Sequence, residues 1–349
     1  MKILDISAGV SIGFINDFHI SKEKIGVSRT NWSEFLSILK TRGIKTAVIG
    51  GDLFEARDSQ TLNVLISVRD MFNEAADLGI NIILANGNHD KVNQEDNNGY
   101  CHLYADMKNV TVVDTWNVIE SPSANIFILA YFPETGSLID KLKDIESSDY
   151  FNNGKTNVLY AHAGVLGALG RENEHEIDVK SFLAFDKVYM GHYHGRTKIG
   201  NVEYIGSSRQ YTYGEDYIKG YNICDADGDL EFIQNKVNDR MFTINVDFND
   251  LPNAKDIVGD IHKDNEDCEG NIHIRFIVSV PTSKVDLINK DELRAAGVNR
   301  IEIKAKVDVS QSVSSSFYKK YDKEQIIETY KGYCTEQHID SSLGLTYLK

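Results

Sequence analysis

Apolar positions alternate between helical and strand-like spacing along the first two-thirds of the chain. Apolar residues at helical spacing predict helices over 31–42 and 59–78. Short apolar runs at 44–49 and 80–85 predict buried strands, and each leads into a polar loop that contains glycine. Two helix-then-strand units of this kind indicate an α/β layered fold.

Capping signals support the two helices. Asn31, followed by Glu34 three residues later, has the pattern of an N-terminal cap, and Gly79 is expected to end the second helix. Beyond them, the same alternation continues to about residue 235. It predicts a helix near 138–145 and strands near 110–114, 126–131, 157–162 and 187–190, then a β-rich stretch with a hairpin turn at 225–228.

The pattern changes near Asn235. The remaining chain is predicted to form a smaller α+β domain over 236–307, with strands at 241–248, 271–280 and 300–307 and helices at 254–262 and 286–296. A Ser-rich run at 310–317 is expected to link this domain to a last helix, roughly 323–337. A chain of 349 residues is long enough for two such domains.

Composition excludes several classes of protein. Hydrophobic residues at 42% and charged residues at 26% are typical of a globular chain and exclude a disordered or collagen-like one. The four cysteines form no CxxC pair, and the sequence starts without a signal peptide, so we expect a soluble, cytoplasmic protein with reduced thiols. The net charge of −15 argues against tight binding of nucleic acid by basic residues alone, although 271–306 holds seven Lys+Arg against four Asp+Glu.

Potential metal ligands cluster in the loops that follow the predicted strands. The clusters are Asp17-Phe18-His19, Gly51-Asp52, Gly87-Asn88-His89-Asp90, His162 and His192-Tyr193-His194. Each one alone has an ordinary interpretation as a surface turn or as a hydrogen-bonded structural histidine. In open α/β sheets, however, the carboxyl ends of strands converge on one crevice. The ordered set therefore predicts a polynuclear metal site.

The donor types indicate which ions would bind. Imidazoles, carboxylates and one amide oxygen, without thiolate, suit Mn²⁺, Fe²⁺ or Zn²⁺ better than Mg²⁺. Asp17 and His19 lie two apart in a segment expected to be extended, so their side chains should point to the same side and share one ion. We expect Asp52 to bridge two ions about 3.5–4 Å apart, the separation typical of two-metal hydrolases.

These motifs also carry a resemblance. D-x-H, GD, GNHD, a solitary His and GHxH, in this order, resemble the calcineurin-like metallophosphoesterase family, and within it the SbcD-type nuclease subunits and their meiotic-recombination-eleven relatives. The resemblance covers roughly 12–225, including GDLFEAR and ILANGNHD. It implies a four-layer α/β/β/α sandwich over 1–235, a capping domain for DNA recognition over 236–307, and a linker with a partner-binding helix over 308–349.

The resemblance also implies roles for individual residues. One metal would be held by Asp17, His19, Asp52 and His194, and the other by Asp52, Asn88, His162 and His192. His89 would be the general acid or transition-state stabiliser near the leaving oxygen, with Asp90 as a possible orienting partner. The residues alone agree on His89, because it follows the ligand Asn88 and so should point elsewhere.

By this resemblance the chain would be a Mn²⁺-dependent DNA nuclease. It would act as a 3′→5′ exonuclease on double-stranded DNA and an endonuclease on single strands, as a homodimer bound to an SbcC-type coiled-coil ATPase in a heterotetramer. Glu55 departs from the histidine that cellular relatives often have after GDLF, which leaves the balance of the two activities open. The alternatives are a phosphodiesterase or phosphatase for a small molecule or protein, and a mainly scaffolding subunit.

Residues near the motifs have two interpretations each. Arg196, Arg209, Tyr211 and Tyr213 could contact phosphate or stack on a base, or they could pack as cross-strand pairs on a β-surface. Lys91 could face the substrate or the solvent.

Overall fold

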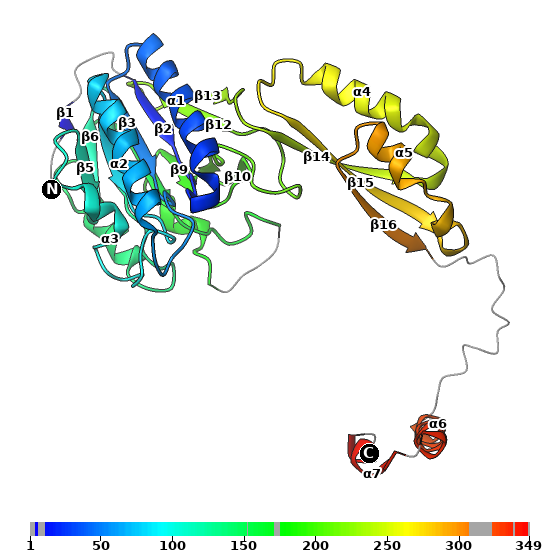
Figure 1. The fold of residues 1–349 in the computed structure, drawn as a ribbon. Coiled ribbons are helices and arrows are strands. Elements are labelled where there is room, and N and C mark those ends of the chain that lie inside the picture. Colours follow the sequence, from blue (N-terminus) through cyan, green and yellow to red (C-terminus); the bar gives the residue numbers. More distant parts are fainter. Residues whose placement is uncertain are drawn as a thin grey trace.

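Two large mixed β-sheets pack face to face, with helices on both outer faces (Figure 1). The computed structural model describes residues 4–5, 11–151, 153–170, 175–306, 323–337 and 339–347. The apolar residues between the sheets come from both of them, for example Phe14 and Val48 on one sheet and Ile126 and Val158 on the other. The expected four-layer α/β/β/α sandwich is confirmed.

The six-stranded sheet carries the first motifs. Its strand order is β13 (Leu230–Gln234), β12 (Gly220–Cys224), β2 (Ile12–Ile15), β3 (Thr46–Gly50), β4 (Asn81–Ala85) and β5 (Val110–Val113). Strands β2 to β5 are parallel, and the β12–β13 hairpin joins them antiparallel to β2. The predicted strands and hairpin turn are therefore present, and the parallel set directs three motif loops to one edge of the sheet.

The seven-stranded sheet carries the later motifs. Its order is β1 (Leu4–Asp5), β6 (Trp116–Glu120), β7 (Ala124–Leu129), β8 (Thr156–His162), β9 (Lys187–Gly191), β11 (Val202–Tyr204) and β10 (Thr197–Ile199). Strands β7, β8 and β9 are parallel, so His162 and the loop after β9 leave the sheet at the same edge. Strand β6 was not expected from the sequence. It pairs antiparallel with β7.

Helices cover the outer faces of the sandwich. Helices α1 (Ile25–Thr41) and α2 (Leu62–Asp77) pack on the six-stranded sheet, and α3 (Leu138–Glu146) packs on the other. Helix α1 begins six residues before Asn31, so the predicted cap at Asn31 is wrong. Asn31 is buried inside the helix, where its amide donates to the Tyr221 hydroxyl at 2.7 Å. Short 3₁₀ helices span Lys22–Lys24, Tyr100–Tyr104, Val179–Phe182, Phe248–Asn253 and Thr282–Leu287.

A separate three-stranded parallel sheet follows. It consists of β14 (Arg240–Asp247), β15 (Ile272–Pro281) and β16 (Arg300–Lys306), with helices α4 (Ala254–Asp264) and α5 (Lys290–Ala295) on one face. The predicted elements are present, although α5 is shorter than expected because a 3₁₀ helix takes up the start of that range.

Two helices end the chain, α6 (Lys323–Glu336) and α7 (Ser342–Tyr347) (Figure 1). Helix α6 matches the predicted last helix, whereas α7 was not predicted. The Ser-rich run at 310–317 lies outside the described residues. Among the residues that the structure describes, no helix has the length and apolar character that a membrane span requires.

Candidate metal centre

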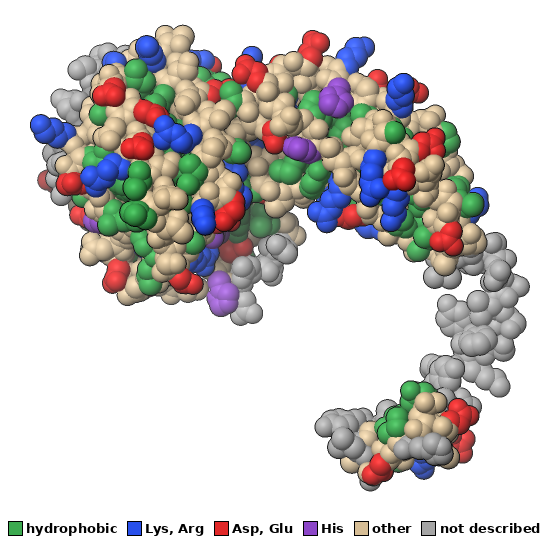
Figure 2. Space-filling view, in the orientation of Figure 1, with side chains coloured by type: hydrophobic (Ala, Val, Ile, Leu, Met, Phe, Trp, Pro, Cys, Tyr) green, Lys and Arg blue, Asp and Glu red, His purple; other side chains and the backbone are tan. Residues whose placement is uncertain are grey.

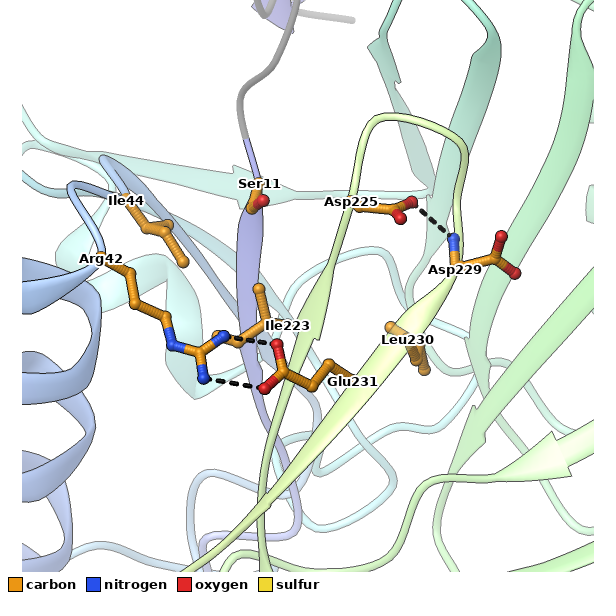
Figure 3. A pocket seen from close by; sticks show the side chains of 8 residues that line it. All are labelled: Ser11, Arg42, Ile44, Ile223, Asp225, Asp229, Leu230 and Glu231. Carbon is orange, nitrogen blue, oxygen red and sulfur yellow. Dashed lines mark hydrogen bonds and ion pairs between the residues drawn. The ribbon is translucent and has the colours of Figure 1, made fainter.

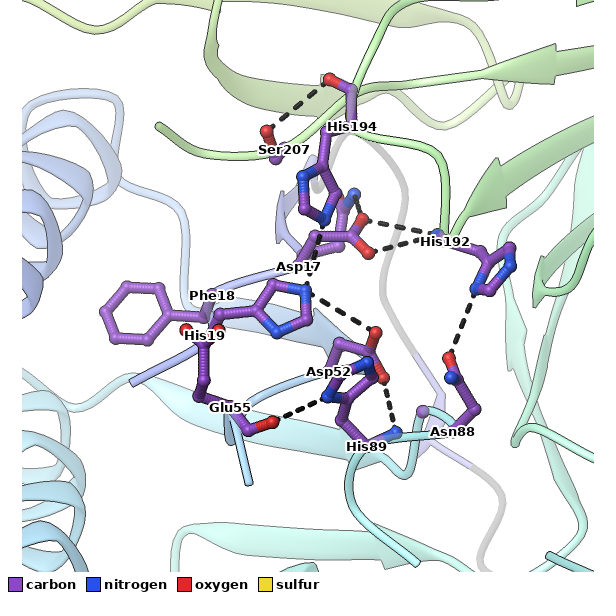
Figure 4. Close-up of polar contacts among 12 residues, drawn as sticks. Asp17, Phe18, His19, Asp52, Glu55, Asn88, His89, His192, His194 and Ser207 are labelled. Atoms are coloured by element: carbon purple, nitrogen blue, oxygen red, sulfur yellow. Dashed lines mark hydrogen bonds and ion pairs between the residues drawn. The ribbon is translucent and has the colours of Figure 1, made fainter. Parts of the chain in front are cut away.

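The predicted ligand residues all lie at the carboxyl ends of parallel strands. Asp17 and His19 follow β2, Asp52 follows β3, Asn88 follows β4, His162 ends β8, and His192 and His194 follow β9. Figure 4 shows that the loops of both sheets meet, so that side chains up to 177 positions apart in sequence lie together. The structure therefore brings together every residue that was expected to hold metal.

The ligand atoms form two groups that meet at Asp52. Asp17, His19 and His194 form one group, and Asp52, His162 and His192 form the other, each with one ligand atom per residue within 4.8 Å of the others. The Asp52 Oδ2 atom lies 3.5 Å from His19 Nε2 and 3.3 Å from His162 Nε2. Asp52 thus has the intermediate position that a bridging carboxylate requires.

The Asn88 amide completes the second group. Its Oδ1 atom lies 3.1 Å from His162 Nε2 and 3.1 Å from His192 Nδ1. In the first group, the Nε2 atoms of His19 and His194 are also 3.1 Å apart. Metal–nitrogen bonds of about 2.1 Å place neighbouring ligand atoms roughly 3 Å apart, so these spacings suit ligands around a shared ion.

Hydrogen bonds on the far side of the imidazoles support the same interpretation. His162 Nδ1 lies 3.2 Å from the Gly50 carbonyl oxygen, and His194 Nδ1 lies 3.4 Å from a Glu215 carboxylate oxygen. Each contact places the proton on Nδ1 and leaves Nε2 free for a cation, as outer hydrogen-bond acceptors do in histidine metal sites. The candidate ligands are buried or partly buried and offer nitrogen and oxygen donors without sulfur, which fits two divalent cations.

The backbone is strained at four of these residues. Asp17, His19, Asp52 and His192 have φ values of 48°, 43°, 50° and 91°, and they are the only non-glycine residues with positive φ among those described. The expectation of an extended Asp17–His19 segment is therefore wrong. Backbone bonds impose the left-handed turn, because the N–H groups of Phe18 and His19 both donate to the Asp52 carbonyl oxygen, at 2.8 and 2.9 Å. Such strain concentrates at functional sites.

Burial sets the protonation of the ligand histidines. It lowers the pKa values of His19 and His192 to about 3, so both imidazoles are neutral at pH 7. Burial also opposes the charged form of His162, but the adjacent Asp52 carboxylate raises its pKa to about 9. In return, and despite its own burial, Asp52 has its pKa held well below the usual range by His162. Metal binding requires neutral imidazoles and an ionised carboxylate, so a cation at the second group has to displace a proton from His162.

His89 uses both ring nitrogens for contacts outside the two groups. Its Nδ1 lies 2.6 Å from the Glu55 carbonyl oxygen, and its Nε2 lies 3.2 Å from Arg57 Nη2. Because a carbonyl only accepts and a guanidinium only donates, Nδ1 carries the proton and Nε2 is the acceptor. Distance alone would allow His89 to join His19 and Asp52 at a cation. Its contacts instead agree with the expected orientation away from the ions.

Asp90 is not placed as expected. Its carboxylate accepts the backbone N–H groups of Leu53 (3.2 Å), Phe54 (2.9 Å) and Gly87 (2.7 Å). The acceptor that orients the His89 ring is the Glu55 carbonyl instead. Asp90 is fully buried and joins the GDLF and GNHD loops, so it supports the site through the backbone.

A cavity of about 320 Å³ opens onto the two groups. It is lined by His19, Lys24, Asp52, Glu55, Arg57, Asn88, His89, His192, His194, Tyr211, Thr212 and Glu215. Lys24, Arg57 and Glu215 were not singled out from the sequence. Arg57 lies within the GDLFEAR motif, but its direction toward His89 depends on the fold of that loop.

Arg209 and Tyr211 pack beneath the first group. Arg209 is buried, donates to the carbonyl oxygens of Phe18 and His19, and lies 4.2 Å from the Tyr211 ring centroid. The Tyr211 hydroxyl donates to the Asp17 carbonyl oxygen, and its ring contacts those of His19 and His194. Neither residue lies in a strand, so the pair does not form the cross-strand contact that was considered and packs on the ligand loops instead.

The other candidates near the motifs also pack. Arg196 is half-buried and donates to the Ile205 carbonyl oxygen and to the Asn222 side chain. Tyr213 contacts Arg275 of the small sheet. Lys91 faces neither substrate nor solvent, because its buried ammonium donates to the Tyr131 carbonyl oxygen at 2.5 Å and lies 3.9 Å from the Phe132 ring centroid.

The fold and the site together define an α/β/β/α protein with a candidate dinuclear metal centre at the edge where the two sheets meet. Comparison with known sequences adds relatives. Exonuclease subunit 1 of Enterobacteria phage T4 is 23% identical over 293 residues, which cover 79% of this chain and 84% of the phage protein. The SbcD subunit of the SbcCD nuclease of Staphylococcus epidermidis is 24% identical over 331 residues, which cover 84% of this chain and 83% of that protein. The chain is thus a homologue of these nuclease subunits, and the resemblance seen in the motifs is confirmed.

Other comparisons are less informative. A dimetal phosphatase from Danio rerio is 8% identical, covers 61% of this chain and 91% of its own, and has a TM-score of 0.42, too low to carry an argument. No family model matches the chain.

Proposed function

We propose that this chain is a metal-dependent phosphodiesterase of the metallophosphoesterase type that cleaves DNA. The observation that carries the proposal is the convergence of seven candidate ligands in two groups that share Asp52, beside a cavity with His89 on its wall. The nuclease homologues support DNA as the substrate. Residues 1–235 would be the nuclease domain.

Two divalent cations, most consistent with Mn²⁺ for this donor set, would neutralise phosphate charge and activate a water when bound. Asp17, His19, Asp52 and His194 would hold one, and Asp52, Asn88, His162 and His192 the other. Fe²⁺, Zn²⁺ or Mg²⁺ could take the same positions.

His89 is suited to proton transfer at the leaving oxygen. Its Nδ1–H is fixed by the Glu55 carbonyl, and its backbone N–H donates to Asp52 Oδ1 at 2.9 Å. The Nε2 atom lies on the wall of the cavity, where it can carry a proton to the departing sugar oxygen. Because the backbone and the ring of His89 are both hydrogen-bonded, its Nε2 atom is kept in one position.

The small sheet offers a surface for DNA, in line with a capping domain over 236–307. Its helices cover the face of Ile274 and Phe276, and the alternate residues of β15 and β16 point the other way, among them Arg275, Arg300 and Lys304. Figure 2 shows Lys and Arg side chains gathered over this sheet. Arg275 contacts the Tyr213 ring and carbonyl oxygen, which joins the surface to the loop that lines the cavity. Basic side chains of this kind bind phosphates.

Exposed apolar residues offer a surface for a second copy of the chain. Leu62 and Ile66 are exposed one turn apart on α2, and Leu103 is exposed on the neighbouring 3₁₀ helix. Val92, which precedes that helix, lines the same pocket as Leu103 and is also exposed. The two helices are in contact, since the hydroxyl of Tyr104 donates to the backbone of α2. Contiguous apolar surface of this kind is typical of protein interfaces. We propose that it forms the homodimer.

The last helices are proposed to bind an SbcC-type coiled-coil ATPase, with residues 308–349 acting as linker and docking segment. Tyr333 of α6 and Ile339 beyond it are exposed apolar side chains. The side chains of Tyr321 and Ile326 lie outside the described residues. Two subunits of each kind would form the heterotetramer.

The activity would be a 3′→5′ exonuclease on double-stranded DNA and an endonuclease on single strands. Glu55 bears on the balance between them. Its carboxylate pairs with Lys24 at 3.1 Å on the cavity wall, where relatives often place a histidine.

A cleavage assay tests the function. The purified chain with Mn²⁺ should shorten a 5′-labelled duplex and cut circular single-stranded DNA, whereas His89→Ala should lose turnover while elemental analysis still finds two metals per chain. Cleavage of a small phosphodiester with no cleavage of DNA would favour the small-molecule enzyme. Binding to the ATPase without cleavage of any phosphodiester would favour the scaffolding role.

A further inference from the structure

Arg57 lies on the wall of the cavity, in the segment that follows the Asp52 ligand. We propose that its guanidinium binds the non-bridging oxygens of the scissile phosphate group, beside the metal centre. This assignment rests on the proposed phosphodiesterase function and identifies the residue that positions its substrate.

The first argument is that Arg57 has no ion-pair partner among the residues the structure describes. The other basic residue of the cavity, Lys24, is paired with the carboxylate of Glu55 at 3.1 Å. Arg209 is buried, and its guanidinium donates to backbone carbonyl oxygens. Arg57 is exposed, and its guanidinium contacts the neutral ring nitrogen of His89. A guanidinium that faces a cavity and pairs with no carboxylate is available to an anion.

The second argument comes from the Asn88 amide. The amide atom that points away from the metal centre lies 2.5 Å from Arg57 Nη2. Without a cation, hydrogen bonding favours Oδ1 at that outer position, where it accepts from Arg57, with the NH₂ group directed to His162 and His192. A bound cation requires the reverse, because only Oδ1 can bind metal.

The reversal changes what surrounds Arg57. With Oδ1 turned to a cation, the NH₂ group of Asn88 faces Nη2, and two donors meet without an acceptor between them. Two donors at this distance repel each other, so the exposed Arg57 side chain has to move away, and a phosphate oxygen within reach of both groups would then accept from both. The metal-loaded site therefore contains a place for an anion that the Arg57 and Asn88 side chains create together.

His89 ties this place to the reaction. Arg57 Nη2 lies 3.2 Å from His89 Nε2, the atom assigned to proton transfer. The contact to Nε2 exists only while that atom is unprotonated, because a guanidinium only donates. When Nε2 carries the proton for the leaving oxygen, the Arg57 N–H is released, and the donors of its planar fork can contact the phosphate beside the imidazole.

Calorimetric titration of the metal-loaded full chain with inorganic phosphate tests the assignment without requiring turnover. Arg57→Gln should weaken phosphate binding by about tenfold or more, and Arg57→Lys, which keeps the charge but loses the fork, should weaken it less. Arg42→Gln is the matched control, since Arg42 is an exposed arginine paired with Glu231 in a different pocket (Figure 3). Arg42→Gln should bind phosphate as the wild type does. All variants should keep two metals per chain.

The outcomes separate this assignment from the proposed function. Equal phosphate affinity in Arg57→Gln and wild type, absence of phosphate binding at millimolar concentration in the wild type, or loss of metal in Arg57→Gln would each overturn it. Loss of phosphate affinity in Arg57→Gln, in a chain that cleaves no phosphodiester, would leave the assignment standing and reject the function. In the active enzyme, Arg57→Gln should also raise KM for bis(4-nitrophenyl) phosphate.

Discussion

The Arg209 guanidinium donates a hydrogen bond to the backbone carbonyl oxygen of His19 at 3.1 Å. It joins a loop that follows the last metal motif to the first one, where the backbone of His19 is left-handed. Arg209 is buried and also stacks on Tyr211, so it fixes the strained loop of Asp17 and His19 on the side away from the solvent.

Arg209→Met should therefore reduce metal affinity. Removing the guanidinium leaves the carbonyl oxygens of Phe18 and His19 buried without a donor, which costs about 1–3 kcal/mol. Calorimetric titration with Mn²⁺ should show weaker binding, and urea unfolding should show lower stability. Arg42→Met, at an exposed ion pair, should change neither. Unchanged Mn²⁺ affinity in Arg209→Met would contradict the role of this residue.

Gly87→Ala should abolish the metal centre. A Cβ atom at Gly87 would lie 2.2 Å from both the backbone nitrogen and Oδ1 of Asp52, so the shared ligand would have to move. Elemental analysis should find fewer than two metals per chain, and DNA cleavage should be lost. Gly26→Ala is the control. Its added methyl meets nothing within 4 Å on helix α1, and it should keep both metals and gain up to about 1 kcal/mol of stability.

Divalent metal should raise the thermal stability of the chain. Ions that bind only the folded state stabilise it by about 3 kcal/mol at one hundred times Kd, so Tm should rise with Mn²⁺ and fall on chelation. Asp52→Asn should lose most of this response because both groups share Asp52. His102→Ala, a histidine paired with Asp114 outside the site, should keep it. A full Mn²⁺ response in Asp52→Asn would argue against a shared ligand.

Lys91 should make stability depend on pH in the alkaline range. Burial lowers its pKa to about 8 from 10.5, so between these values the unfolded chain binds more protons than the folded one. Stability contributed by this group therefore rises with pH from about 8 to 10.5. As the pH rises through that range, the Tm of the wild type should therefore increase relative to the Tm of Lys91→Met. A difference that stays constant with pH would show that Lys91 keeps an ordinary pKa.

Ile66→Glu should separate the proposed homodimer into monomers. The substitution places a charge on exposed apolar surface, where it costs nothing in the monomer but must be desolvated in the interface. Light scattering after gel filtration should report the mass of one chain for Ile66→Glu. Leu183→Glu, at a more exposed leucine next to the 3₁₀ helix Val179–Phe182, should elute as the wild type does. A dimeric Ile66→Glu would place the interface elsewhere.

Much of the fold follows from local pattern. The strands at β3, β4 and β8 are buried on both faces, and such strands appear in sequence as short apolar runs. Local pattern did not predict the start of α1 at Ile25, because Asn31 and Glu34 have the spacing of a helix cap. Both residues in fact bond to Tyr221, about 190 positions away. A polar pair inside a helix is explained only by its distant partner.

The candidate metal ligands were predictable for a related reason. Each follows an apolar strand, and parallel strands bring their carboxyl ends to one edge, so the order of strands and ligands in the sequence already defines the set. The sequence does not show how the backbone turns at those ends. The left-handed conformations of Asp17 and Asp52 arise from hydrogen bonds between the β2 and β3 loops, and they replace the extended segment that spacing alone suggested.

Pattern in the sequence by itself determined the layered α/β elements, the small second domain and the residues that gather at the metal centre, because hydrophobic periodicity and position after a strand are local properties. The four-layer sandwich was implied by the resemblance of the motifs. The tertiary structure decided which groups support and surround those residues. Asp90 bonds to backbone instead of to His89, Arg209 lies beneath His19, and Arg57 faces the His89 ring. These contacts join separate loops, so they depend on how the sheets pack and exist only in the folded chain.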